Sequence, residues 1–273
     1  MRRRHVPAGV LIAVLAGGAG SLIAQNAVTK QPTPADWAAL AKLPDFSGVW
    51  EAGGGGGGAR GAARAGGGGG GGGARGGGRG AAPAGPQLTP AAEAIRKAQQ
   101  SKAAEDNQTA NCLPPGMPGI MGQPYPMEFL LTPGKVTIVI EAYQQVRHIY
   151  TDGRPLPADP DLKFHGTSIG RWEGDTLMVE TVGFSPLTQI VNGVPAGEKA
   201  RIVERFRLTD PDTMSIETTI TDPEVLTAPS TSSRTLRRHR DWTIAEYICE
   251  ENNRNFVDAN GKAGIKLENP SKK

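Results

Sequence analysis

The stretch of sequence that decides the fold covers residues 124–154 and reads PYPMEFLLTPGKVTIVIEAYQQVRHIYTDGR. It contains three short runs of β-branched and aromatic residues, which end at the turn compositions TPG, QQ and TDGR. Runs spaced in this way predict consecutive antiparallel hairpins. If QQ is a two-residue turn, Glu141 lies directly opposite His148, with the two Cβ atoms about 4.5–5.5 Å apart. This predicted acid–imidazole pair makes Glu141 and His148 candidate catalytic residues.

Similar runs predict β structure over most of the remaining chain. They cover residues 46–51, 167–172, 176–182, 201–208, 213–221, 235–240 and 242–250. Tight turns join nearly all of them, and a meander of this size tends to close on itself and so remove its edges. We therefore predict a mainly β protein, an antiparallel up-and-down β-barrel of about ten strands. One or two short helices precede most of it, because Thr33 and Thr89 are suitable N-caps and each is followed by proline.

The N-terminus predicts an export signal. Three arginines are followed by an apolar run over residues 10–15 and then by small residues up to position 24. The apolar run is far shorter than the ~20 residues of a membrane-spanning helix. Cleavage is compatible with several positions, and an uncleaved interfacial anchor is the alternative. We expect an exported protein, periplasmic or secreted, with no transmembrane segment in the mature chain.

The predicted organisation follows changes in composition. Glycine dominates residues 53–85, where so little apolar surface predicts a flexible insertion. Arginine among glycine also resembles RNA-binding segments, but the tract has no aromatic residue for base stacking. The predicted segments are a signal peptide (1–24), an N-terminal segment with a short helix (25–44), the first barrel strand (45–51), the insertion (52–86), a helix and the main barrel (87–258), and a polar tail (259–273).

Charge argues against a nucleic-acid partner. The formal charge of +3 falls to 3 − 3 = 0 when Arg2, Arg3 and Arg4 leave with the signal. Without the four arginines of the glycine tract it becomes 0 − 4 = −4. A folded part with this sign is poorly suited to polyanions. The oligomeric state is left open by the sequence.

The two cysteines, Cys112 and Cys249, predict one disulfide. An even count in an oxidising compartment favours pairing, and two cysteines allow only one connectivity. Two separate buried thiols are the alternative. Neither cysteine has a second ligand at the spacing of a zinc site, so we expect no metal. Motifs for nucleotides, haem or a serine nucleophile are absent from the sequence, and we expect no cofactor.

Two resemblances bear on the fold. Gly48-Val49-Trp50, which follows a short helix and opens a β-meander, resembles the GxW signature of lipocalins and other calycin-like barrels. That resemblance implies that Trp50 packs across the closed end of the barrel beneath an arginine, for which Arg254 is the candidate. The chain departs from lipocalins in the glycine-rich insertion after its first strand. The blocks CLPPGMP, PYPMEF, RHIYTDGR, SIGRWEGDTL, ERFRLTDPDT and EYICEENNR resemble an uncharacterised family of exported bacterial proteins, which implies export and a β-rich fold.

Strand alternation selects further candidate residues. Glu204 shares a strand face with Ile202 and Phe206, and Glu246 shares one with Trp242 and Ile244. An acid among apolar neighbours is paired with a cation, raised in pKa, or functional. As a pair, each acid would contact Arg147 or Arg171, and we predict that Glu204 is buried opposite Thr218. As a catalytic group, either acid could act as a general base.

Several further side chains are candidates for ligand contact. Tyr143 and Tyr150 lie on the same predicted face as Glu141 and His148, and His165 ends a loop just before a strand. The predicted ligand-binding set is therefore Tyr143, Tyr150, His165, Arg171 and Arg147.

A closed barrel of this size can enclose a small ligand. The sequence accordingly favours an exported barrel that binds a small, mainly hydrophobic molecule. One alternative is a cofactor-independent enzyme with acid–base chemistry in the cavity, such as a hydratase, isomerase or hydrolase, so whether the protein is an enzyme stays open. Another is a structural or interaction module of the cell envelope. Two acids that meet a histidine with no arginine in reach would favour catalysis, whereas acids held by arginine would favour binding or structure.

Overall fold

The computed structural model of this chain describes residues 31–52, 85–101, 108, 112–191, 193–249, 255–257 and 263–265. The predicted signal peptide and nearly all of the predicted insertion lie outside these residues. Within the described residues, no helix is both long enough and apolar enough to cross a membrane.

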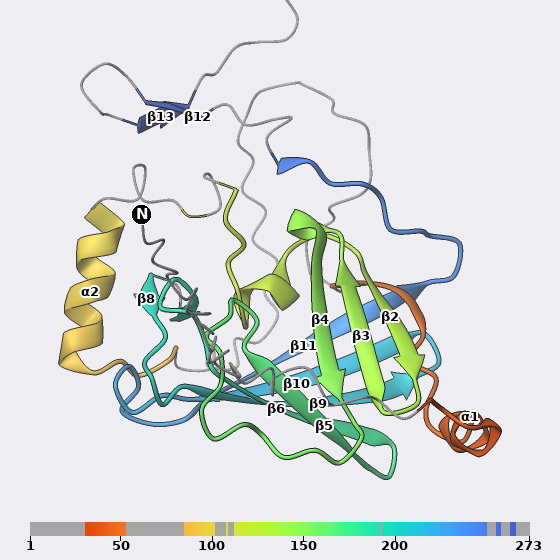
Figure 1. The fold of residues 1–273 in the computed structure, drawn as a ribbon. Coiled ribbons are helices and arrows are strands. Elements are labelled where there is room, and N and C mark those ends of the chain that lie inside the picture. The colour runs from red at the N-terminus through yellow and green to blue at the C-terminus, as the bar shows by residue number, and fades with distance from the viewer. Residues whose placement is uncertain are drawn as a thin grey trace, which may run out of the picture.

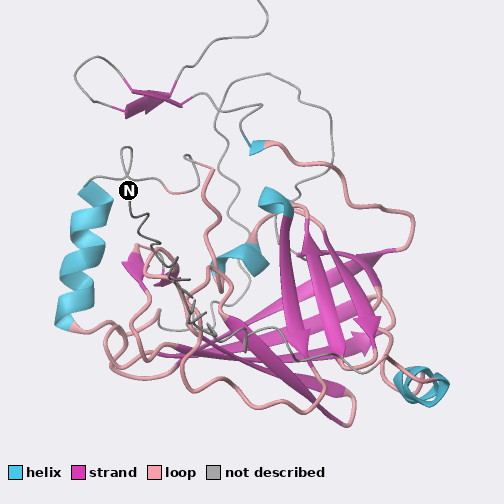
Figure 2. Cartoon of the chain, viewed as in Figure 1, coloured by secondary structure: helices cyan, strands magenta, loops and turns pink. Residues whose placement is uncertain are grey.

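A closed β-barrel forms the body of the molecule, so the predicted fold class is confirmed (Figures 1 and 2). In the described part of the chain nine strands close it, in the order β1-β2-β3-β4-β5-β6-β9-β10-β11 and back to β1. The barrel strands are β1 (Gly48–Ala52), β2 (Met127–Thr132), β3 (Lys135–Ile140), β4 (Gln145–Tyr150), β5 (Thr167–Glu173), β6 (Thr176–Val182), β9 (Arg201–Asp210), β10 (Thr213–Thr221) and β11 (Ser230–His239). In Figure 1, β2, β3 and β4 cross over the more slanted strands β5, β6, β9, β10 and β11.

One junction of the barrel differs from the all-antiparallel meander that the sequence predicts. The loop over residues 151–166 carries the chain back along β4 before β5 begins, so β5 runs parallel to β4. The two strands pair only through Ile149 with Ser168 and Tyr150 with Ile169. Among the described residues, the first part of β4 therefore has no strand partner on this side.

Short helices, turns and hairpins lie outside the barrel strands. Helix α1 (Pro34–Leu40) begins with a capping box in which Thr33 and Asp36 exchange hydrogen bonds. Thr33 is therefore the N-cap, as predicted. Helix α2 (Pro90–Ser101) lies beside the hairpin of β7 (Gln189–Val191) and β8 (Val194–Pro195) (Figure 1). Two 3-10 turns, η1 (Gly119–Gly122) and η2 (Ala142–Gln144), lie in loops. A small hairpin of β12 (Asn255–Val257) and β13 (Ala263–Ile265) falls partly within the predicted polar tail.

Aromatic side chains fill one end of the barrel. Trp50 is fully buried, donates a hydrogen bond from Nε1 to the carbonyl oxygen of Phe46 at 2.9 Å, and contacts Phe129 edge-on. The guanidinium of Arg238 lies over the Trp50 ring, 4.5 Å from its centroid. The arginine above this tryptophan therefore comes from β11, whereas Arg254, the residue expected for this place, lies outside the described residues.

The register of β3 and β4 corrects the predicted Glu141–His148 pair. Ile140 pairs with Gln145, so the connection contains the four residues 141–144, and His148 lies opposite Thr137. The prediction was wrong because QQ is not a two-residue turn: Tyr143 and Gln144 both adopt positive φ, which moves the turn toward the N-terminal side. Glu141 leaves the strand and accepts a hydrogen bond from the backbone nitrogen of Ala245 at 2.9 Å.

The predicted strand over residues 242–250 is also wrong. Beyond β11 the described chain continues to Cys249 without strand pairing, and the barrel closes through β11 and β1 instead. The rings of Trp242 and His239 stack with their centroids 3.6 Å apart, and Tyr247 packs against Tyr125 and Tyr143. Cβ alternation therefore does not apply here, and Glu246 is exposed.

The predicted disulfide between Cys112 and Cys249 is confirmed. Their Cα atoms are 5.6 Å apart, within the usual range for a bridge. The bond fixes the end of the extended segment 241–249 to the loop that precedes η1.

Candidate functional site

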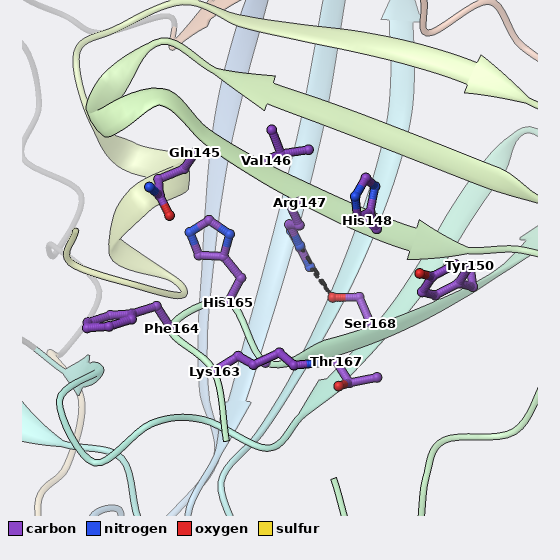
Figure 3. Close-up of a pocket in the computed structure, with 11 residues that line it drawn as sticks. Gln145, Val146, Arg147, His148, Tyr150, Lys163, Phe164, His165, Thr167 and Ser168 are labelled. Carbon is purple, nitrogen blue, oxygen red and sulfur yellow. Dashed lines mark hydrogen bonds between the residues drawn. The ribbon is translucent and has the colours of Figure 1, made fainter. Parts of the chain in front are cut away.

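A pocket of about 390 Å³ opens where β4 and β5 separate. Its walls come from β4 and from the segment that leads into β5 (Figure 3). The lining residues are Gln145, Val146, Arg147, His148, Tyr150, Lys163, Phe164, His165, Gly166, Thr167 and Ser168. Because β5 begins only beside the end of β4, the first part of β4 lies next to the loop that leads into β5, and the pocket lies between them.

Arg147 leads from the pocket into the barrel. Its side chain is 1% exposed and forms an ion pair with Glu204, which is equally buried, through Nη1 at 3.2 Å and through a short contact from Nη2. Nε and Nη2 also donate to Ser168 Oγ at 3.4 and 3.3 Å, and Nη2 donates to Thr181 Oγ1 at 3.1 Å. Figure 3 shows Arg147 reaching from β4 toward Ser168. The pocket floor is thus a connected polar network.

The same network confirms the predicted environment of Glu204. Glu204 pairs with Thr218 across β9 and β10, as the register Leu208–Met214 predicts, and Arg147 is the cation that reaches it. A buried carboxylate with a bidentate guanidinium is both charge-compensated and hydrogen-bonded, which a buried charge requires.

His165 forms the wall next to this network. The pKa of His165 is lowered to about 4, mainly by burial and also by the charge of Arg147, while an interaction with the backbone of Val146 acts in the opposite direction. The ring is therefore neutral at ordinary pH. Nε2 is buried and has no hydrogen-bond partner among the described residues.

The charge of the pocket lining has one sign. Arg147 and Lys163 are its cations, and none of the eleven lining residues is acidic. Glu204 lies behind Arg147. In the described part of the chain, the one acid that contacts the Lys163 ammonium is exposed Asp161, at 3.7 Å. Val146, Phe164 and the ring of Tyr150 add apolar surface. The pocket can therefore hold an amphipathic molecule, with a polar or anionic group toward Lys163, the cation that Glu204 does not compensate.

The structure brings together four of the nine candidate site residues at this pocket. Arg147, His148, Tyr150 and His165 line it. His148 is exposed, its Nδ1 lies 3.3 Å from Thr137 Oγ1, and burial together with the charge of Lys135 lowers its pKa. The guanidinium of Arg154 lies 3.9 Å above the Tyr150 ring. Glu204 does not line the pocket itself but contacts Arg147, which does.

The other four candidates lie elsewhere. Arg171 projects from the outer surface of β5 and pairs with Glu173 and Glu180. Tyr143 packs on Tyr247, whose pKa is raised to about 12 by burial and by contact with Tyr125 and Tyr143. Glu141 holds the backbone of Ala245, and Glu246 is exposed. The two predicted acids therefore do not converge on one site.

Sequence reasoning missed Ser168, Thr181, Lys163 and Phe164 as site residues. Strand alternation, which selected Glu204, could also have selected Ser168 and Thr181. Ser168 shares a face with Gly170 and Trp172, and Thr181 with Leu177 and Val179. Lys163 and Phe164 lie in a loop, where no periodicity indicates direction. Within the described residues, no group of three or more His, Cys, Asp or Glu side chains could hold a metal ion.

Comparisons of the chain with protein-family models, with curated proteins and with solved structures found no match.

Proposed function

We propose that this protein is an exported binding protein that takes up a small, mainly hydrophobic molecule with a polar or anionic end group. The ligand enters the pocket between β4 and the segment that leads into β5, and its apolar part contacts Val146 and Phe164. Its end group is directed toward Lys163, because Glu204 already compensates the charge of Arg147. The observation that carries the proposal is this pocket of about 390 Å³ with two cations and no acid in its lining. Pockets that bind small molecules combine mainly apolar walls with a few polar groups in this way.

Two further observations support binding rather than acid–base catalysis. Glu204, the acid nearest to the pocket, is held by both oxygens on Arg147, so it is not free to accept a proton from a substrate. Glu246, the second predicted acid, is exposed on the segment after β11. Export is supported by the signal-like N-terminus and by the disulfide, since disulfides persist in oxidising compartments.

The test measures binding of anilinonaphthalene sulfonate, an amphipathic aromatic anion, to the disulfide-bonded protein by fluorescence. Val146→Ser in the pocket lining should weaken binding at least severalfold. The matched control is Leu130→Ser: both side chains project outward from neighbouring parts of the barrel with similar exposure, 47% for Val146 and 43% for Leu130, but Leu130 does not line the pocket. Equal effects of the two substitutions would place the probe on a general apolar surface and contradict the proposal.

Native mass spectrometry of protein purified from its own envelope gives the complementary result. A co-purifying molecule that is lost from Val146→Ser and retained by Leu130→Ser would identify the ligand. A ligand that both variants retain equally would place the binding site elsewhere.

A further inference from the structure

Arg234 lies where β11 extends beyond its neighbour β1. The strand β11 covers Ser230–His239, but β1 pairs with it only from Leu236 to His239. On its other side Arg234 pairs with Ile216 of β10, which is 1% exposed. Because directly paired residues project from the same face of a sheet, Arg234 projects toward the barrel interior. It lies at the end of the barrel wall that β1 leaves uncovered.

This guanidinium is half-buried, and within the described part of the chain it forms no hydrogen bond and no ion pair within 4 Å. The charge that faces it is Glu204, whose two oxygens already bind Arg147. Burial lowers the pKa of Arg234, while Glu204 acts in the opposite direction. An arginine has five N–H donors and stays charged in proteins, so these donors need acceptors.

Among the residues that the structure describes, the interior charges near Glu204 do not balance. Arg147 and Arg234 are two cations that both interact with one carboxylate, Glu204. Partly removing an ion from water is costly unless an opposite charge compensates it. One further negative charge next to Arg234 would complete the balance.

The backbone of Gly122, at the end of η1, packs closely against the guanidinium of Arg234. A Cβ atom at Gly122 would lie 2.6 Å from Nη1 of Arg234, so any side chain there would displace the guanidinium. Gly122 itself is exposed, whereas the neighbouring Met121 is buried. The guanidinium therefore lies directly beneath a solvent-exposed stretch of backbone.

We propose that Arg234 anchors a second binding site, separate from the pocket between β4 and β5, that takes a monoanionic carboxylate. The planar fork of a guanidinium binds a carboxylate through two parallel hydrogen bonds. A single negative charge matches the single uncompensated positive charge. A dianion such as phosphate would be repelled more strongly by Glu204, which interacts with the same guanidinium.

The experiment follows the backbone amide resonances of the disulfide-bonded protein by NMR during titration with butyrate, because they remain observable in every variant. A resonance next to the site, such as that of Gly122, should shift saturably, and the shift should be lost in Arg234→Gln. The matched control is Arg237→Gln on the same strand, because Arg237 is exposed and pairs with Glu51 and Thr213 on the outer face. Butanol, which has the same carbon chain without the charge, should give no saturable shift.

Arg234→Lys keeps the charge but removes the fork, so it should weaken butyrate binding at least tenfold, and it serves if Arg234→Gln does not fold. Inorganic phosphate should bind more weakly than butyrate. The proposal is overturned if no resonance responds saturably to butyrate, if the response persists in Arg234→Lys at full strength, or if phosphate binds as well as butyrate. Because Val146→Ser should leave the butyrate response unchanged, failure here is distinguishable from failure of the pocket proposal.

Discussion

Two sets of ion pairs in this barrel use the same residue types in opposite surroundings. Inside, Arg147 and Glu204 are both 1% exposed and share their network with Ser168 and Thr181. Outside, a chain of pairs crosses β5, β6 and β9, and its side chains are 24–56% exposed. The outer chain runs Arg201–Glu180–Arg171–Glu173–Arg205.

The difference shows that distance alone does not set the value of an ion pair. The outer contact between Arg201 and Glu180 is 2.6 Å long, yet water screens it, and such pairs typically contribute about 0.2–1 kcal/mol. Removing one partner of the inner pair leaves the other as an uncompensated buried charge, which costs about 3–5 kcal/mol. Residue type alone does not rank these pairs, because both combine arginine with glutamate on β-strands; the strand face on which each side chain lies does.

The largest effect is expected for Glu204→Gln. The substitution strands the Arg147 guanidinium inside the barrel and should lower the free energy of unfolding by about 3–5 kcal/mol, as measured by urea denaturation with the disulfide intact. The double variant Arg147→Met, Glu204→Leu should recover part of the loss, because apolar replacements remove both charges together. A Glu204→Gln protein that melts like wild type while losing ligand binding would show that Glu204 serves the site rather than the fold.

The next effect concerns pH and His165. The pKa of His165 is about 4 in the folded protein against an ordinary value of 6.5, so between these pH values the unfolded chain binds a proton that the folded chain does not. Stability contributed by His165 is therefore present above pH 6.5 and is lost as the pH falls toward 4. Between pH 7.5 and 4.5 the loss should be about 2–3 kcal/mol.

This pH effect is measured as the difference between wild type and His165→Gln in unfolding free energy against pH. His148→Gln is the matched control on the exposed side of the same pocket and should leave most of the slope in place. If His165→Gln keeps the full wild-type slope, His165 is not the group that titrates.

A smaller effect is expected for Thr181→Val, which is nearly isosteric and removes one acceptor of the inner network. Arg147 Nη2 and Ser168 Oγ both contact Thr181 Oγ1, at 3.1 and 2.9 Å. Loss of hydrogen bonds to a charged, buried donor should cost about 1–3 kcal/mol in unfolding free energy. Thr219→Val is the control, because its hydroxyl lies on the exposed face of β10 and contacts only Thr231 at 3.0 Å among the described side chains. Equal losses in the two variants would mean that the network does not hold Arg147.

The smallest effect is expected on the outer face. Glu180→Gln removes the carboxylate that Arg171 and Arg201 share, yet it should lower the unfolding free energy by at most about 1 kcal/mol, and less at high salt. A double-mutant cycle between Glu180 and Arg201 measures the coupling directly. A coupling as large as the Arg147–Glu204 value would remove the contrast between the two faces.

The sequence by itself determined the parts of this protein that depend on local pattern. Cβ alternation placed Glu204 among apolar neighbours, and the TDPD turn set the register that put Thr218 opposite it. The even cysteine count gave the bridge between Cys112 and Cys249. These inferences succeed because strand period, turn composition and disulfide connectivity involve only short stretches or a single possible pairing.

Only the tertiary structure decided where the candidate residues meet. Whether residues 242–250 pair as a strand depends on a free barrel edge, and β1 had already taken the edge of β11, so Glu246 lies exposed. Because β5 returns parallel to β4, the pocket opens beside β4 and His165 lies next to Arg147. His165 belongs to the loop before β5, where the sequence has no periodicity that could indicate this contact. Such contacts are set by which strands close the barrel and in which direction, and that choice minimises unpaired edges over the whole chain rather than in any one segment.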